Sequence, residues 1–124
     1  TSNPASISQY AALAALEGDQ SFTNVVVKTL KERHDFVYSS LLEMNGVECR
    51  ACQGTFYTFP KVQSAMSRLG IDTDVQLSEF LIEEARVAVV PGSAFGAPGY
   101  VRISFATSME NLKRAMSRIR DVLA

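Results

Sequence analysis

A segment rich in glycine and proline, residues 91–99, is followed after Tyr100 by a stretch with the period of a β-strand, residues 101–106. Its glycines allow backbone angles and close approaches that a side chain would block, and its prolines stiffen it. In the strand, apolar side chains alternate with others, so Arg102 is predicted on the face opposite the apolar one. A planar guanidinium on a rigid strand suits bidentate capture of a carboxylate. A plain surface arginine on an exposed strand fits the same pattern. The apolar positions are Val101, Ile103 and Phe105.

Length and charge restrict the classes of partner. The chain has 124 residues, enough for one domain with a core, and a formal net charge of -1. Such a balance gives no electrostatic footprint for nucleic acid or an anionic membrane surface, so neither partner is expected. No apolar run approaches the roughly 20 residues of a membrane span. Residues 1–10 are polar and do not resemble a signal peptide, so a cytoplasmic location is expected.

The two cysteines, Cys49 and Cys52, have the C-x-x-C spacing of half a zinc site or of a redox pair. A second pair of ligands is missing and His34 is the only histidine, so no metal site is predicted. A redox pair usually lies at a helix N-terminus, whereas this one lies between strand-like segments. Two ordinary reduced thiols are therefore predicted. His34, beside Asp35 in a helical segment, is expected on the helix surface.

Two helices are predicted in the first part of the chain. Residues 5–16 form a helix of small apolar residues, with Pro4 at its first position and Gly18 as its stop. Such a helix is expected to be buried against something large, and a start at Thr1 without Met suggests a cut through a longer protein. A second helix, residues 22–44, ends at Asn45-Gly46. At 1.5 Å per residue it would be about 34 Å long, which suits an element that bridges two domains. Its apolar stripe is Phe22, Val26, Leu30, Val37, Leu41 and Met44, with Arg33 on the same stripe.

From residue 47 onward the elements are predicted in the order β-β-α-α-β-β-α. The strands are residues 47–51, 55–59, 87–90 and 101–106, and the helices are residues 61–69, 73–85 and 107–123. Thr73-x-x-Gln76 and Thr107-x-x-Glu110 have capping-box spacing. The fold class is therefore an α/β (α+β) sandwich, a small and mainly antiparallel sheet covered by helices. Inward positions are Val75, Leu77, Phe80, Leu81 and Ile82 in the middle helix, and Leu112, Met116, Ile119 and Leu123 in the last.

No self-contained active site is evident. The adjacent pair Glu83 and Glu84 would face different directions on a helix, and no glycine motif has the spacing of a phosphate loop. The remaining candidates form a binding constellation: Arg102, the 91–99 loop, residues 54–57 and residues 1–3. A stand-alone small-molecule-binding α/β module would also fit this constellation.

Three blocks of the sequence resemble one family. Pro91–Gly96 and Gly99, followed by Val101–Ala106, resemble the C-terminal signature of fold-type I, pyridoxal-phosphate-dependent aminotransferases, most closely prokaryotic aspartate aminotransferases. Gln53–Pro60 is similar to the family's glycine-aromatic segment, with Thr55 in the alanine place. Residues 1–9 are similar to the segment shortly after the cofactor lysine. The blocks occur in the family's order, and the resemblance covers the whole chain.

The resemblance implies roles for individual residues. Arg102 would grip the substrate α-carboxylate, and Gly54 and Phe56 would contact the substrate. Ser2, with Thr1 and Asn3, would reach the neighbouring subunit's active site near the cofactor phosphate, which implies a homodimer. The implied divisions are the tail of a large cofactor-binding domain at residues 1–21, an interdomain helix at residues 22–46 and the C-terminal small domain at residues 47–124.

One part of the family pattern is missing from this sequence. The Schiff-base lysine in its Ser-x-Ser-Lys setting is absent, as are the aspartate, tyrosine and arginine of the cofactor cradle. The resemblance therefore implies no catalytic residue here, and no cofactor bound to this chain alone. Pyridoxal 5'-phosphate would act in a full-length aminotransferase that uses aspartate or other amino acids and 2-oxo acids. This chain alone is expected to be inactive. An aminotransferase-like sensor domain of a transcription regulator is an alternative.

Overall fold

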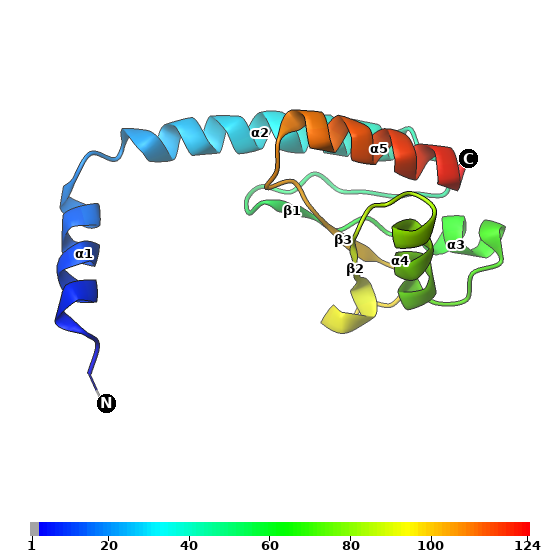
Figure 1. Ribbon diagram of the computed structural model, residues 1–124. Helices are drawn as coiled ribbons and strands as arrows, with labels where there is room; N and C mark the ends of the chain where they lie inside the picture. Colours follow the sequence, from blue (N-terminus) through cyan, green and yellow to red (C-terminus); the bar gives the residue numbers. More distant parts are fainter. Residues whose placement is uncertain (1–2) are drawn as a thin grey trace.

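The computed structural model describes residues 3–124. Its elements follow the expected order except that no strand forms at residues 47–51, and the other strands are shorter than expected (Figure 1). They are α1 (Ser6–Glu17), α2 (Ser21–Leu42), β1 (Tyr57–Thr58), α3 (Gln63–Leu69), α4 (Asp74–Glu83), β2 (Val90–Pro91), the 3-10 helix η1 (Gly92–Phe95), β3 (Val101–Ser104) and α5 (Met109–Leu123).

The sheet is small and antiparallel, which confirms the coarse fold class. Its three strands lie in the order β1-β3-β2, so the Arg102 strand is central. Tyr57 is paired with Ser104 on one side of β3, and Val90 is paired with Arg102 on the other. Helix α5 runs beside the second half of α2 along one side of the sheet, while α3 and α4 lie near its other end (Figure 1).

The core lies between the α2–α5 pair and the inner face of the sheet. The predicted stripe of α5 is fully confirmed, since its four apolar residues are each at most 2% exposed. The period of β3 is confirmed as well, because its apolar residues and Phe105 are buried while Arg102 lies on the other face. Each of the larger buried apolar side chains of α5 and β3 stabilises the fold by on the order of 1.5–3 kcal/mol, because it is removed from water. The shared core includes Val37, Leu41, Val101, Ile103, Phe105, Leu112, Met116, Ile119 and Leu123.

Two of the predicted strands are wrong. Residues 47–51 keep only one bridge, between Glu48 and Lys61, which itself bridges to Tyr100. In the segment 87–90 only Val90 joins the sheet. The N–H of Val87 instead donates to the carbonyl of Leu81, which ties this segment to the end of α4. Apolar β-branched residues favour a strand, but without a neighbouring strand to pair with they remain irregular.

Local helix signals were more reliable. Thr73 and Gln76 form the predicted capping box, and Gly70, with φ of 68°, ends α3. The predicted box at Thr107 is wrong, because Ser108 caps α5 by accepting the N–H of Asn111. The hydroxyl of Thr107 is used instead by the side-chain amide of Asn111.

Further corrections concern single positions on helices. Pro4 precedes α1, whose N-cap is Ala5, so it is not the first helical residue. Val75 and Ile82 were expected to point inward, but they are 45% and 47% exposed. Helix α4 is covered along a narrower stripe than predicted, centred on Leu77 and Leu81.

The N-terminal part of the molecule leaves apolar side chains uncovered. No residue of α1 is buried, and this helix stands apart from the sheet at the end of the long α2 (Figure 1). Phe22, at the start of the predicted stripe of α2, is 74% exposed. The stripe is thus buried only in the second half of α2, where α5 packs against it. Other exposed apolar residues here are Ile7, Tyr10, Leu13, Leu16, Val25 and Val27.

Within residues 3–124, no helix combines the length and the apolar character required to cross a bilayer.

Candidate substrate-binding site

Arg102 lies on the central strand, on the sheet face opposite the core. Its guanidinium carbon is 4.4 Å from the ring centre of Tyr57 and 4.5 Å from that of Phe95. Among residues 3–124 it has no ion pair, since the five salt bridges involve other side chains. The guanidinium therefore keeps its N–H donors available for a ligand.

The glycine loop is folded tightly against the start of β3. The N–H of Gly92 donates to the carbonyl of Tyr100 at 2.8 Å. A Cβ atom at Gly92 would lie 2.3 Å from the carbonyl oxygen of Ala97, so only glycine fits here. Gly96, with φ of 73°, then turns the chain after η1. The predicted close approach of backbone segments in this loop is present.

Asp74 anchors this loop to α4, and the sequence did not single it out. Its carboxylate is 2.6 Å from the N–H of Ser93, which donates to it, and the residue is only 3% exposed. Asp74 is also in the first turn of α4, where a negative charge is favoured. Acidic residues are common in the first turn of any helix. The sequence therefore carried no sign that Asp74 also accepts a hydrogen bond from the loop.

Aromatic rings surround Arg102 on the open sheet face. Tyr57 packs against Phe56 with ring centres 4.3 Å apart. Beyond Phe95, Phe59 lies at 6.0 Å and stacks in turn on Tyr100 at 5.3 Å. Phe56, Phe59 and Phe95 are 40%, 37% and 48% exposed, so none of them belongs to the closed core. This aromatic face is residues 56, 57, 59, 95 and 100 together with Arg102.

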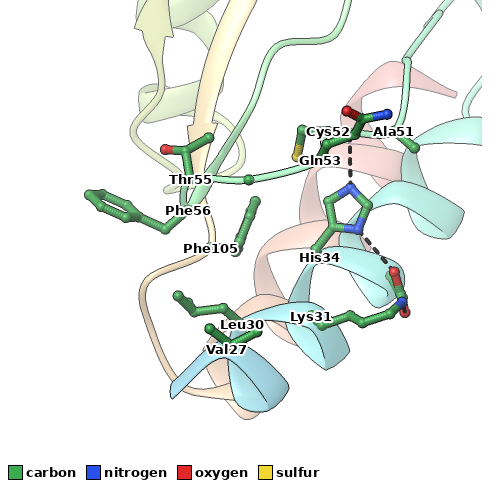
Figure 2. Close-up of a pocket in the computed structure, with 12 residues that line it drawn as sticks. Val27, Leu30, Lys31, His34, Ala51, Cys52, Gln53, Thr55, Phe56 and Phe105 are labelled. Carbon is green, nitrogen blue, oxygen red and sulfur yellow. Dashed lines mark hydrogen bonds and ion pairs between the residues drawn. The ribbon is translucent and has the colours of Figure 1, made fainter. Parts of the chain in front are cut away.

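Gly54 and Phe56 line a separate open pocket of about 680 Å³ between α2 and residues 51–56 (Figure 2). Arg102 does not line this pocket. Phe56 connects the two regions: it contacts Tyr57 of the aromatic face, and its ring points away from His34 (Figure 2). The predicted substrate contacts of Gly54 and Phe56 thus lie beside the Arg102 region rather than around the guanidinium. The pocket lining also includes Val27, Leu30, Lys31, His34, Cys52 and Phe105.

His34 is not the surface histidine that was expected. Its side chain is 12% exposed, stacked on Tyr38 and in edge contact with Phe105. Its Nε2 accepts the backbone N–H of Cys52 at 3.2 Å, and its Nδ1 lies 2.9 Å from a carboxylate oxygen of Asp35 (Figure 2). The error arose because residues 51–56 fold over the ring, which is a contact 18 positions away along the chain.

Charges near His34 are arranged along α2. A hydrogen bond from Lys31, followed by one from His34, lowers the pKa of Asp35. Because Nε2 of His34 accepts the backbone N–H of Cys52, the hydrogen of the neutral imidazole is on Nδ1, and Nδ1 donates to Asp35. The histidine therefore links the long helix to the segment that precedes Gly54.

Both cysteines are unpaired and partly buried. The Cys49 thiol lies 3.1 Å from the hydroxyl of Thr58, and the Cys52 thiol donates to the carbonyl of Tyr57. Burial is the main cause that raises the pKa of Cys49. A raised pKa disfavours the thiolate, so this thiol is a poor nucleophile at neutral pH. Within residues 3–124, no cluster of three or more His, Cys, Asp or Glu side chains could hold a metal ion.

Of the three N-terminal candidates, only Asn3 belongs to the part of the chain that the structure describes. Thr1 and Ser2 lie outside the described residues. Asn3 is exposed ahead of α1, which stands apart from the sheet (Figure 1). The predicted contact with a neighbouring subunit therefore stays a prediction for all three residues.

Solved structures of aminotransferases have this arrangement of sheet, helices and glycine loop. The crystal structure of the aspartate aminotransferase from Rhizobium meliloti matches with a TM-score of 0.91 and 40% identity, over 99% of this chain and 32% of that one. The alanine aminotransferase from Pyrococcus furiosus matches with a TM-score of 0.87 and 32% identity, over 97% of this chain and 30% of that one. The fold is thus that of part of an aminotransferase.

The family follows from the sequence. Residues 1–119 match the model of the family "Aminotransferase class I and II", and the chain belongs to that family. The aspartate/prephenate aminotransferase of Nitrosomonas europaea is 45% identical over 130 residues, covering 100% of this chain and 33% of the relative. The aspartate aminotransferase of Geobacillus stearothermophilus is 44% identical over 119 residues, covering 96% and 30%. The chain therefore spans about a third of the length of these relatives, and the predicted family resemblance is confirmed.

Proposed function

We propose that this chain is the C-terminal portion of a pyridoxal-phosphate-dependent aminotransferase and that it supplies the clamp for the substrate α-carboxylate. The substrates would be aspartate or a similar amino acid and a 2-oxo acid. The observation that carries the proposal is Arg102, held between two rings on an open sheet face without an anionic partner among residues 3–124. The relatives are named aminotransferases, which favours this function over a regulatory sensor or a stand-alone binding module.

The chemistry of Arg102 suits a carboxylate. A guanidinium presents donors in a planar fork that matches both oxygens of a carboxylate, and it remains charged at any physiological pH. A strand fixes the Cα position more firmly than a loop does. Arg102 is half-buried between the two rings, and partial exclusion of water strengthens a charged hydrogen bond.

We also propose how this chain is divided within the larger protein. Residues 1–21 would belong to a large domain, residues 22–46 would form the connecting helix, and residues 47–124 would form the small domain and lid. The uncovered apolar side chains of α1 and of the first half of α2 support this division, because packing against a large domain would bury them. The family resemblance adds a homodimer, with residues 1–3 near the neighbouring subunit.

The described residues do not fit the role of a cofactor cradle. In aminotransferases, pyridoxal phosphate accepts the amino group, and it is held by a lysine. Lys31 is 73% exposed and bound to Asp35, and Lys61 is paired with Glu48 on the surface. Lys28 and Lys113 are exposed on helices. The cofactor lysine would therefore come from another part of the protein, and this chain would bind and orient the substrate.

The test uses two substrates that differ only in the α-carboxylate. β-Alanine is aspartate without that group. In the full-length protein that contains this sequence, Arg102→Ala should lower kcat/KM for aspartate by roughly 30- to 5,000-fold, since losing a desolvated charged partner costs about 2–5 kcal/mol. The slow reaction of β-alanine should be unchanged. Arg118→Ala, a change of an exposed arginine on α5, is the matched control and should alter neither.

Two results would contradict the proposed function. An unchanged ratio between aspartate and β-alanine in Arg102→Ala would remove Arg102 from the site. Turnover of aspartate and 2-oxoglutarate by the purified 124-residue chain alone would contradict its role as a substrate-binding portion that depends on the rest of the protein.

A further inference from the structure

Arg102 is held from two sides by rings that come from different elements. Tyr57 belongs to β1 and Phe95 to the end of η1, which follows β2. Because the strand order is β1-β3-β2, these two rings reach the central strand from its opposite neighbours. The guanidinium carbon is almost equally distant from both ring centres, at 4.4 and 4.5 Å. Both distances are well within the reach of a cation–π contact.

Phe95 is placed by a rigid support and not by the core. The N–H of Ser93 is bound to the buried carboxylate of Asp74, and Gly92 is packed where no side chain fits. Phe95 itself is 48% exposed, and its ring contacts are Arg102 and Phe59. An aromatic ring that is half in water gains only part of the free energy of burial, and its position places it against Arg102.

The two rings restrict what Arg102 can do. A free arginine side chain samples many rotamers, and binding a carboxylate would have to order it. Rings on both sides limit the guanidinium to the gap between them. They offer it no hydrogen-bond acceptor in its plane, so its N–H edge stays available. The guanidinium is thereby held ready before the substrate arrives.

We propose that Tyr57 and Phe95 are positioning residues that hold Arg102 in the geometry that binds the substrate carboxylate. The proposal rests on the proposed function of Arg102 as the α-carboxylate clamp. It assigns the two rings to the recognition of the α-carboxylate. Their loss weakens only the binding of substrates that carry an α-carboxylate.

The experiment compares leucine and aromatic replacements in the full-length protein. Phe95→Leu and Tyr57→Leu remove the rings and keep apolar bulk, whereas Phe95→Tyr and Tyr57→Phe keep the rings. We expect each leucine variant to lower kcat/KM for aspartate by about 3- to 10-fold, mainly through KM, and to leave β-alanine unchanged. The aromatic variants should stay within about twofold of the parent. Because Phe95 is about half exposed and lies outside the core, Phe95→Leu should fold like the parent.

A double variant separates this proposal from the clamp itself. In an Arg102→Ala background, Phe95→Leu should have no further effect on aspartate, because the ring acts through Arg102. If Phe95→Leu lowers aspartate and β-alanine equally, or acts fully in the Arg102→Ala background, the positioning role is refuted while the clamp stands. If Arg102→Ala leaves the ratio of the two substrates unchanged, the clamp fails, and the positioning role fails with it.

Discussion

Removing the ring of His34 should destabilise the chain far more than a change on a helix surface would. Its side chain is 12% exposed, and Nε2 accepts the N–H of Cys52. In His34→Ala that partly buried donor loses its partner, which costs about 1–3 kcal/mol. The lost contacts with Tyr38 and Phe105 add about 0.5–1.5 kcal/mol each. We expect a total loss of about 2–6 kcal/mol in the free energy of unfolding.

The assay is urea unfolding of the chain followed by far-UV circular dichroism. His34→Phe keeps a ring between Tyr38 and Phe105 but cannot accept a hydrogen bond, so it should lose only about 1–3 kcal/mol. Lys31→Ala is the control on the same helix. Its side chain is 73% exposed and its pair with Asp35 is on the surface, so the change should be below about 0.5 kcal/mol.

The order of the three variants tests the reasoning about His34. If His34→Ala unfolds within about 0.5 kcal/mol of the parent chain, the bond to Cys52 and the ring packing carry no stability. If His34→Ala and His34→Phe lose the same amount, the ring contacts contribute nothing and the hydrogen bond explains the whole effect. Either result would show that the hydrogen bond and the ring contacts of His34 do not both contribute to stability.

Two further predictions concern the glycine loop and the thiols. Asp74→Ala should lower the free energy of unfolding by about 1.5–3 kcal/mol, because the N–H of Ser93 loses a charged acceptor in a buried place; urea unfolding measures this, and a change below about 0.5 kcal/mol would contradict it. In a Cys52→Ser variant, the alkylation rate of Cys49 should rise with pH to a midpoint above its ordinary pKa of 9.0, because burial raises the pKa of this thiol. The unfolded chain releases this proton first, so the stability contributed by the neutral thiol is complete below pH 9 and declines as pH rises from there. A midpoint of the alkylation rate below pH 9.0 would contradict the raised pKa of Cys49.

The elements with local signals were predictable from the sequence. The Thr73–Gln76 capping box, the glycine that ends α3 and the stripe of α5 each depend on residues within a few positions of one another. The period of two in β3 also placed Arg102 on the correct face. These features depend on the type and spacing of residues that are close in the sequence, so the sequence displays them directly.

The features that failed depend on contacts between distant residues. The segment 47–51 has the composition of a strand but finds a partner only at Glu48. His34 looked like a surface residue because the segment that covers it begins 17 positions later, at Ala51. For the candidate site, the sequence indicated Arg102 and the loop, but not the ring of Phe95 or the buried Asp74. Neither residue stands at a position where its type is unusual.

The difference between the two faces of the sheet supports the proposal that Arg102 binds a ligand. On the inner face, Val101, Ile103 and Phe105 are at most 6% exposed, as a core requires. On the outer face a charged residue is expected, but exposed aromatic rings are not, because each ring in water gives up favourable burial. On a sheet face that contacts only solvent, polar residues around Arg102 would be more favourable than aromatic ones. The contacts of Tyr57 and Phe95 with the guanidinium therefore support the proposal that Arg102 is held in one position for a carboxylate ligand.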